Sequence, residues 1–137
     1  MRAVVLLLLF VPNLAACEKV SRVRECRKLG ASVAEAGAAL EAAAKANRAA
    51  DYRAASKRYL ELAKQARQTR FKSATGQAAV EEYALALESV APPVTAYADA
   101  LEQEDRRAQA ELRREIERIA RREHAAVGRI DGFCRAP

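Results

Sequence analysis

Apolar residues recur at steps of three and four along almost the whole chain after residue 22. In the last third these positions are Val94, Ala98, Leu101, Ala108, Leu112, Ile116, Ile119, Ala126 and Ile130. This spacing places side chains on one face of an α-helix, whereas a half-buried strand would need strict alternation. Alanine contributes 33 of the 137 residues, so helix-forming residues dominate. The sequence therefore predicts an all-α protein.

Breaks between the periodic segments predict four helices. We expect the first over about 19–46, the second from Asp51 as its cap to about 70, and the third from Thr75 as its cap to Pro92 and Pro93. The last is expected over about 94–127, ended by Gly128 and Gly132. Short turns make neighbouring helices antiparallel, which gives an up-down four-helix bundle. The alternative is a long two-helix hairpin, helical through Asn47 and only kinked at Pro92.

Two glycines occupy equivalent positions in the first predicted helix. The apolar seam of this helix reads Val23, Cys26, Gly30, Val33, Gly37, Leu40, Ala44 and Asn47, with heptad spacing. A glycine inside a helix costs about 1 kcal/mol relative to alanine. We therefore expect a neighbouring helix to approach closely at Gly30 and Gly37, the alternative being chance drift in an alanine-rich sequence.

The start of the chain has the layout of a bacterial secretion signal. Arg2 precedes an apolar run over 3–11, and small residues follow. Residues 14–17 read Leu-Ala-Ala-Cys and resemble the lipobox of bacterial lipoproteins. The resemblance implies cleavage between Ala16 and Cys17 and a diacylglycerol on Cys17, with acyl chains such as palmitate. Residues 1–16 would be the signal peptide and 17–137 a single helical domain.

Two other interpretations of this segment fit less well. An ordinary secretory signal prefers a small residue three positions before the cut, where this chain has Leu14. A transmembrane helix needs about 20 apolar residues, and this run is broken by Pro12 and Asn13. In Gram-negative lipoproteins an aspartate after the lipidated cysteine commonly retains the protein at the inner membrane. Glu18 stands there instead, so the resemblance implies an outer-membrane lipoprotein facing the periplasm.

Lipidation of Cys17 would leave two of the three cysteines, Cys26 and Cys134. An oxidising compartment favours a disulfide between them, which would enclose nearly the whole mature chain. Four antiparallel helices bring the chain ends to the same end of the bundle, and we expect 128–134 to fold back as a tail so that the two cysteines meet. The alternative is two free thiols.

Residues that carry chemistry are scarce in this sequence. His124 is the only histidine, and it is expected on a charged helix face. Cys26 and Cys134 do not have metal-ligand spacing, and we found no phosphate-binding glycine loop or nucleophile elbow. We therefore expect no enzyme activity, no cofactor and no metal site.

The chain is basic, with a formal charge of +6. The residues that could bind an anionic ligand are Arg106, Arg107, Arg113, Arg114, Arg118, Arg121 and Arg122. The alternative is a solvated helix face with interleaved acids. Our leading hypothesis is a non-enzymatic envelope lipoprotein that acts as a structural or protein-interaction module at the membrane. The other hypotheses are a module that binds lipopolysaccharide or peptidoglycan and a carrier of small hydrophobic molecules. A small-molecule ligand is not favoured, and no nucleic-acid partner is expected.

Overall fold

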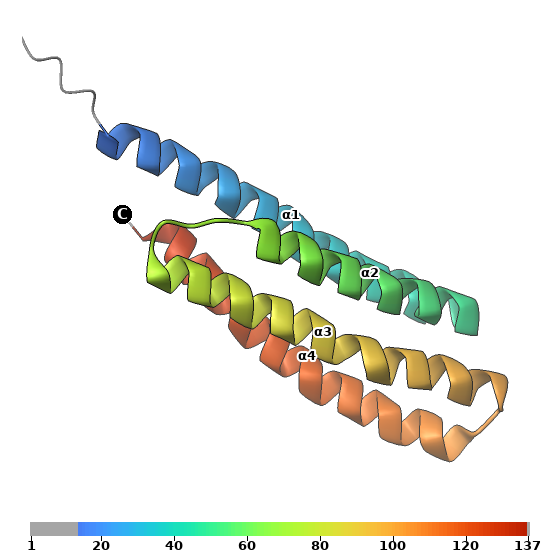
Figure 1. Ribbon diagram of the computed structural model, residues 1–137. Coiled ribbons are helices and arrows are strands. Elements are labelled where there is room, and N and C mark those ends of the chain that lie inside the picture. Colours follow the sequence, from blue (N-terminus) through green and yellow to red (C-terminus); the bar gives the residue numbers. More distant parts are fainter. Residues whose placement is uncertain (1–13, 137) are drawn as a thin grey trace, which may run out of the picture.

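A computed structural model describes the backbone of residues 14–136 and the side chains from residue 19 to residue 136 (Figure 1). This part of the chain forms four helices, α1 (Leu14–Ala46), α2 (Ala49–Gln68), α3 (Ala74–Glu102) and α4 (Arg106–Arg135). The apolar run over 3–11, which belongs to the predicted signal peptide, lies outside the described residues. Cys17 falls in the first turn of α1, and its side chain also lies outside the described part.

The four helices pack as an antiparallel up-down bundle, which confirms the predicted fold class (Figure 1). The two-helix alternative is wrong, because Asn47 interrupts the helix with a φ of 49° and α2 begins at Ala49. Helix α3 packs closely along both α2 and α4. Helix α1 packs mainly against α2 and meets α4 at few positions, so it is the least embedded of the four.

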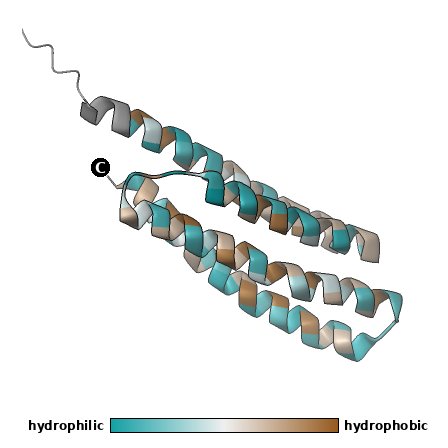
Figure 2. Ribbon diagram, viewed as in Figure 1, coloured by the Kyte–Doolittle hydropathy of each residue, from teal (hydrophilic) through white to brown (hydrophobic). Residues whose placement is uncertain are grey.

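The core is centred on α2 and α3 and is narrow. All four tyrosines are buried in it, and the rings of Tyr52 and Tyr97 pack in a tilted arrangement with their centroids 4.8 Å apart. Nearly half of the buried apolar residues are alanines, which bring helices close but remove little surface from water. Apolar positions lie mostly on the inner faces of the helices (Figure 2). Such a core leaves much of the stability to contacts at its edges.

Helix α1 turns a different face to the bundle from the predicted seam. Its buried residues are Glu25, Leu29, Ala36 and Ala43, whereas Val23 is 52% exposed. The expected close approach at Gly30 and Gly37 is wrong, since a Cβ at either position would meet no atom within 4 Å. In an alanine-rich helix, neighbouring faces carry almost the same apolar pattern, so periodicity alone placed the seam about one residue away.

The caps of α2 and α3 also differ from the prediction. Arg48 holds the N-cap position of α2, and Asp51 lies within the first turn, where its carboxylate accepts hydrogen bonds from the Arg48 guanidinium. At α3 the cap is Ser73 rather than Thr75, and its hydroxyl accepts a hydrogen bond of 3.0 Å from the Gly76 backbone. The two helices therefore begin three and two residues before the expected positions.

The predicted break at Pro92 and Pro93 is wrong, because α3 continues through both prolines to Glu102. Proline removes a helical hydrogen bond and normally kinks or ends a helix. Here contacts with α2 hold α3 on both sides of the pair. The Ser56 hydroxyl donates to the Ala91 carbonyl at 2.9 Å and accepts from the Thr95 hydroxyl at 2.8 Å. Pro93 itself is buried against the neighbouring helices.

The third turn therefore lies at 103–105, and α4 begins twelve residues later than expected. Asp105 caps α4, with its carboxylate accepting from the backbone of Arg107 and Ala108. Helix α4 continues through Gly128 and Gly132, so the predicted end of the helix and the returning tail are both wrong. Because α4 starts later, it reaches the level of Cys26 as a continuous helix.

Candidate functional site

A disulfide joins the first helix to the last. Cys26 of α1 and Cys134 of α4 are bonded across a sequence separation of 108 residues. Phe133, the neighbour of Cys134, packs against Phe71 with ring centroids 4.7 Å apart, and thereby brings the α2–α3 connection to the same level. Figure 1 shows the N-terminal part of α1, this connection and the C-terminus together at one end of the bundle. We call this the disulfide end.

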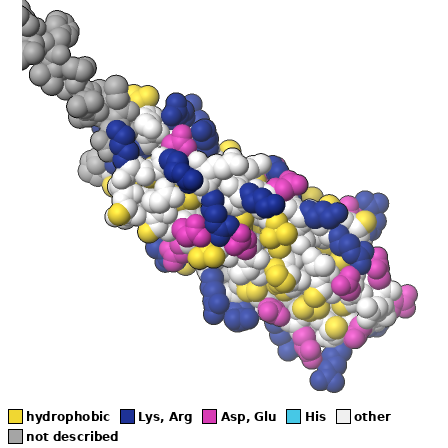
Figure 3. Space-filling model, in the orientation of Figure 1, with side chains coloured by type: hydrophobic (Ala, Val, Ile, Leu, Met, Phe, Trp, Pro, Cys, Tyr) yellow, Lys and Arg dark blue, Asp and Glu magenta, His cyan; other side chains and the backbone are white. Residues whose placement is uncertain are grey.

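The disulfide end is strongly basic. Its three segments, 19–28, 67–72 and 129–136, carry ten basic residues and two acidic ones. The basic residues are Lys19, Arg22, Arg24, Arg27, Lys28, Arg67, Arg70, Lys72, Arg129 and Arg135. The turn end opposite, over 41–53 and 99–107, carries five basic and six acidic residues. Figure 3 shows this gradient on one face, with blue side chains near the grey N-terminal segment and magenta ones more frequent toward the other end.

Several basic residues of the bundle are engaged in ion pairs between helices. Arg67 of α2 binds Glu81 and Glu88 of α3. Its hydrogen bond lowers the pKa of the Glu88 carboxyl. At the turn end Arg53 binds Glu102 and Asp99 in the same way, at 2.6 Å each, and lowers the pKa of Glu102. These arginines hold α2 to α3 and are not available to a ligand without breaking those pairs.

The seven arginines proposed from the sequence as anion ligands are all exposed on α4. Arg107 pairs with Glu111 and Arg118 with Glu115, at 3.1 and 3.8 Å. Arg113 donates a 3.0 Å hydrogen bond to the Tyr97 hydroxyl and lies 6.0 Å from the centroid of that ring. The other four form no ion pair with any side chain described here, namely Arg106, Arg114, Arg121 and Arg122.

Three of these arginines form one stripe. Arg107, Arg114 and Arg121 are spaced seven residues apart on α4, so they lie along nearly the same line on the helix surface. The buried face of α4 is marked by Ile119, Ala126 and Ile130 on the opposite side. We call the three residues the arginine stripe. The whole helix holds nine arginines against five acidic residues.

Four polar residues, one from each helix, interact inside the bundle. They are Ser32, Tyr59, Tyr83 and Glu123. The hydroxyls of Ser32 and Tyr83 lie 3.5 Å apart. Burial raises the pKa of Tyr83 to about 12 and raises that of Tyr59 further, with the negative charge of Glu123 adding to both effects. Burial also raises the pKa of Glu123, which is half-buried. Sequence patterning gave no sign of this carboxyl, because Glu123 stands among charged residues.

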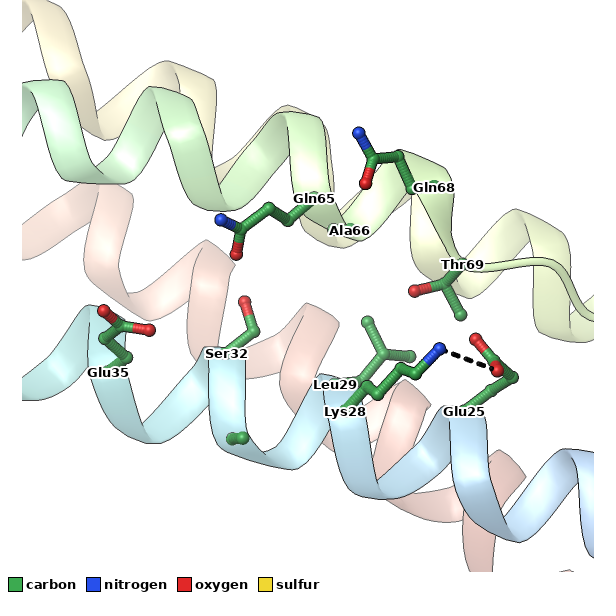
Figure 4. Close-up of a pocket in the computed structure, with 10 residues that line it drawn as sticks. Glu25, Lys28, Leu29, Ser32, Glu35, Gln65, Ala66, Gln68 and Thr69 are labelled. Carbon is green, nitrogen blue, oxygen red and sulfur yellow. Dashed lines mark hydrogen bonds and ion pairs between the residues drawn. The ribbon is translucent and has the colours of Figure 1, made fainter.

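A groove of about 340 Å³ lies between α1 and α2 near the disulfide end (Figure 4). Glu25 lies at one end of the groove, only 7% exposed, and accepts a 3.2 Å hydrogen bond from Lys28. Ser32 projects from α1 toward Gln65 of α2, and Thr69 closes the end near Glu25. The groove is open and most of its lining residues are polar, and its charged residues form ion pairs within the protein. The sequence did not point to Glu25, because its burial depends on the packing of α1.

Two further hollows are surface features. One lies on α4 beside Ala120 and His124, and the other is lined by alanines of α1 and α2 together with Asp51 and Arg58. Both are more open than the groove beside Glu25. None of the three is an enclosed apolar chamber of the kind that a hydrophobic carrier needs.

The part of the chain that the structure describes holds neither a metal-ligand cluster nor a membrane-spanning helix. His124 is exposed on α4. Within residues 14–136, no cluster of three or more histidine, cysteine or acidic side chains could hold a metal ion. None of the helices in this range has both the length and the apolar character needed to cross a membrane. No family model matches the chain, and no curated protein or solved structure is significantly similar to it.

Proposed function

We propose that this chain is a non-enzymatic lipoprotein of the bacterial envelope, in which a disulfide-closed helical bundle presents a charged surface to an envelope protein. Two features support the membrane attachment. The Leu-Ala-Ala-Cys sequence resembles a lipobox, and Cys17 lies in the same helix as Cys26, which is tied to α4. A lipid on Cys17 would therefore hold the whole bundle through a continuous helix and a covalent bond.

The observation that carries the interaction role is the arginine stripe. Arg107, Arg114 and Arg121 point away from the core along α4. Arg107 has only an exposed ion pair with Glu111, and Arg114 and Arg121 have none with the described side chains, so the folded bundle gains little from the stripe. Arginine is also enriched at interfaces, because its planar guanidinium binds carboxylates in a fixed geometry. A protein partner with an acidic face fits this surface.

The membrane attachment is tested by the intact mass of protein extracted with detergent and alkylated with or without reductant. We expect the mass of residues 17–137 plus acyl chains, with two thiols that appear only after reduction. Glu18 implies recovery in the outer-membrane fraction. A mass without acyl chains would contradict the proposed anchor.

The interaction role is tested by photo-crosslinking in living cells. A photoreactive residue replaces Ala110 or Ala125, which are exposed beside the arginine stripe, and the matched control replaces exposed Ala78 of α3. We expect a discrete adduct from the α4 positions that disappears when the three arginines of the stripe are changed to glutamine. The same background from all three positions would contradict a protein partner on α4.

The arginine stripe also favours a second function, binding of an anionic envelope polymer such as lipopolysaccharide or peptidoglycan. Exposed arginines attract such polymers through charge, and salt screens that attraction over about 10 Å at moderate ionic strength. Purified lipopolysaccharide and peptidoglycan fragments would then bind with an affinity that falls as salt rises. No binding, or binding insensitive to salt, would exclude this function.

A further inference from the structure

The charge of the bundle is divided along its long axis. The disulfide end has ten basic residues against two acidic ones, whereas the turn end is slightly acidic. Glu81 and Glu82 reach the disulfide end from α3, where they bind Arg67 and Arg129. Even with these two carboxylates included, basic residues remain in large excess. The linear sequence hides this excess because it is divided among three segments.

Part of this excess has no acidic partner. Arg24 and Lys28 share Glu25, and Arg135 binds Asp131. In contrast, Lys19, Arg27 and Lys72 are exposed and form no ion pair with any side chain from residue 19 onward that the structure describes. Arg70 is also exposed and donates to backbone carbonyls at the end of α2. These cationic groups face solvent around the end of the bundle.

We propose that the disulfide end binds the anionic phospholipid headgroups of the membrane that carries the protein, and so fixes the bundle with its turn end pointing away. The proposal rests on the proposed lipid at Cys17, which selects this end as the one near the membrane. Cys26 lies nine positions after Cys17, a rise of about 13 Å along a helix. Lys19 and Arg27 lie within or just beyond this stretch of α1.

Lys19 lies two positions after Cys17 and so stands nearest the surface, whereas Arg27 and Lys72, at the level of Cys26, reach the headgroups only when the disulfide end lies close to them. Anionic headgroups attract Lys and Arg within roughly a Debye length, about 8 Å at physiological ionic strength. The acyl chains would keep the protein at the membrane, and the basic end would set its orientation. The near-neutral turn end has no comparable attraction, so the bundle is expected to stand with the α1–α2 and α3–α4 turns exposed to partners.

A tryptophan reporter tests this orientation, because the chain contains no tryptophan. Ala74→Trp places the reporter at the exposed start of α3, at the disulfide end, and Gln103→Trp places it at the turn end. Each variant is purified from cells, its mass is recorded, and it is reconstituted into vesicles that contain a headgroup spin-labelled lipid. The vesicles are phosphatidylcholine alone or phosphatidylcholine with phosphatidylglycerol.

We expect phosphatidylglycerol to increase the quenching at position 74 and added salt to reverse the increase, with little quenching at position 103. Lys19→Gln, Arg27→Gln and Lys72→Gln together should abolish the increase. The matched control, Lys45→Gln, Lys57→Gln and Lys64→Gln, removes the same charge from α1 and α2 outside the disulfide end and should leave it intact. Equal quenching at position 74 in both kinds of vesicle, or equal loss in both triple variants, would overturn the proposal.

The mass separates this outcome from failure of the lipid anchor. If the protein carries no acyl chains, the proposed anchor is wrong, and sedimentation of the same protein with the two kinds of vesicle decides the inference. Binding to phosphatidylglycerol vesicles alone that the Lys19, Arg27 and Lys72 variant loses would still support the basic end. No preference for these vesicles would overturn it.

Discussion

Cys26 and Cys134 are joined although 108 residues separate them, and their bond ties the least embedded helix to the last one. Helix α1 rests mainly on α2, and from residue 19 to its end Leu29 is the one large apolar side chain that it buries deeply. The disulfide is therefore the strongest single constraint on α1. It also couples any force on Cys17 to the rest of the bundle.

Reduction of the disulfide is expected to lower the free energy of unfolding by about 2–5 kcal/mol, because the reduced chain regains the entropy of a very long loop. The loss should fall first on α1. Denaturant unfolding would measure the total, and amide hydrogen exchange should show α1 exchanging much faster while α3 stays protected.

The control for this prediction is the Cys26→Ser and Cys134→Ser double variant, which should match the reduced protein and not respond to reductant. If exchange rose equally in α1 and α3, the bundle would unfold as one unit. The view of α1 as a separately held helix would then be wrong.

Alanine at Gly30 or Gly37 should stabilise the protein by about 1 kcal/mol each. Both glycines are exposed within α1, and an added Cβ would meet no atom within 4 Å, so only the helix propensity changes. Thermal and denaturant unfolding of Gly30→Ala, Gly37→Ala and the double variant would measure the gain. Additive increases are expected, because the two sites share no neighbour.

Gly76→Ala is the opposite case and serves as the control. A Cβ there would lie 2.5 Å from the Phe133 ring and 2.9 Å from the Phe71 side chain. Both rings belong to the contact that closes the disulfide end, so the change should cost about 1–3 kcal/mol. Stabilisation at Gly76, or destabilisation at Gly30, would contradict the packing described for α1.

The fold class could be predicted from the sequence, because steps of three and four persist through the chain and the first two connections interrupt them. The third turn was misplaced for a physical reason. Local propensity ends a helix at Pro92 and Pro93, whereas contacts with neighbouring helices, such as the Ser56 hydroxyl on Ala91, keep α3 helical through them. Aspartate is a favoured capping residue, but the break expected at Pro92 and Pro93 placed the start of the last helix near residue 94, before Asp105.

The surfaces could be predicted only in part. The arginines of α4 could be predicted as an exposed basic surface because they lie close together in the sequence. The basic disulfide end was not predicted, because Arg27 and Lys72 come from separate segments that only the arrangement of the helices brings to the same end. Burial of Glu25 and Glu123 also depends on which face of α1 and α4 turns inward, and an alanine-rich pattern defines that face poorly.

The hydroxyl of Ser56 is expected to contribute about 1–2 kcal/mol to stability. It donates to the Ala91 carbonyl and accepts from Thr95, so Ser56→Ala removes two hydrogen bonds in the buried seam beside the two prolines. The control is Ser89→Ala, whose exposed hydroxyl bonds only to the Ala86 carbonyl within α3. Urea unfolding of the two variants gives the comparison, and equal losses would show that the Ser56 contact does not support α3.

The carboxyl of Glu123 should make the stability of the bundle depend on pH. Burial raises its pKa above the ordinary value of 4.5, so the unfolded chain ionises first as pH rises. Below that ordinary value Glu123 is protonated in both states and costs nothing. Above it, stability falls until the folded state also ionises, and the loss then stays constant. Glu123→Gln should therefore be more stable than the natural protein at pH 7 and equal to it near pH 4.

The exposed Glu117 on the same helix provides the matched control, since Glu117→Gln removes the same charge without the burial. Urea unfolding of both variants and the natural protein between pH 4 and 7 would measure the difference. A gain at pH 7 that is specific to Glu123→Gln and vanishes near pH 4 is the expected result. If Glu123→Gln were less stable at pH 7, the ionised carboxylate would be held by favourable contacts, and the polar centre of Ser32, Tyr59, Tyr83 and Glu123 would be stabilising rather than costly.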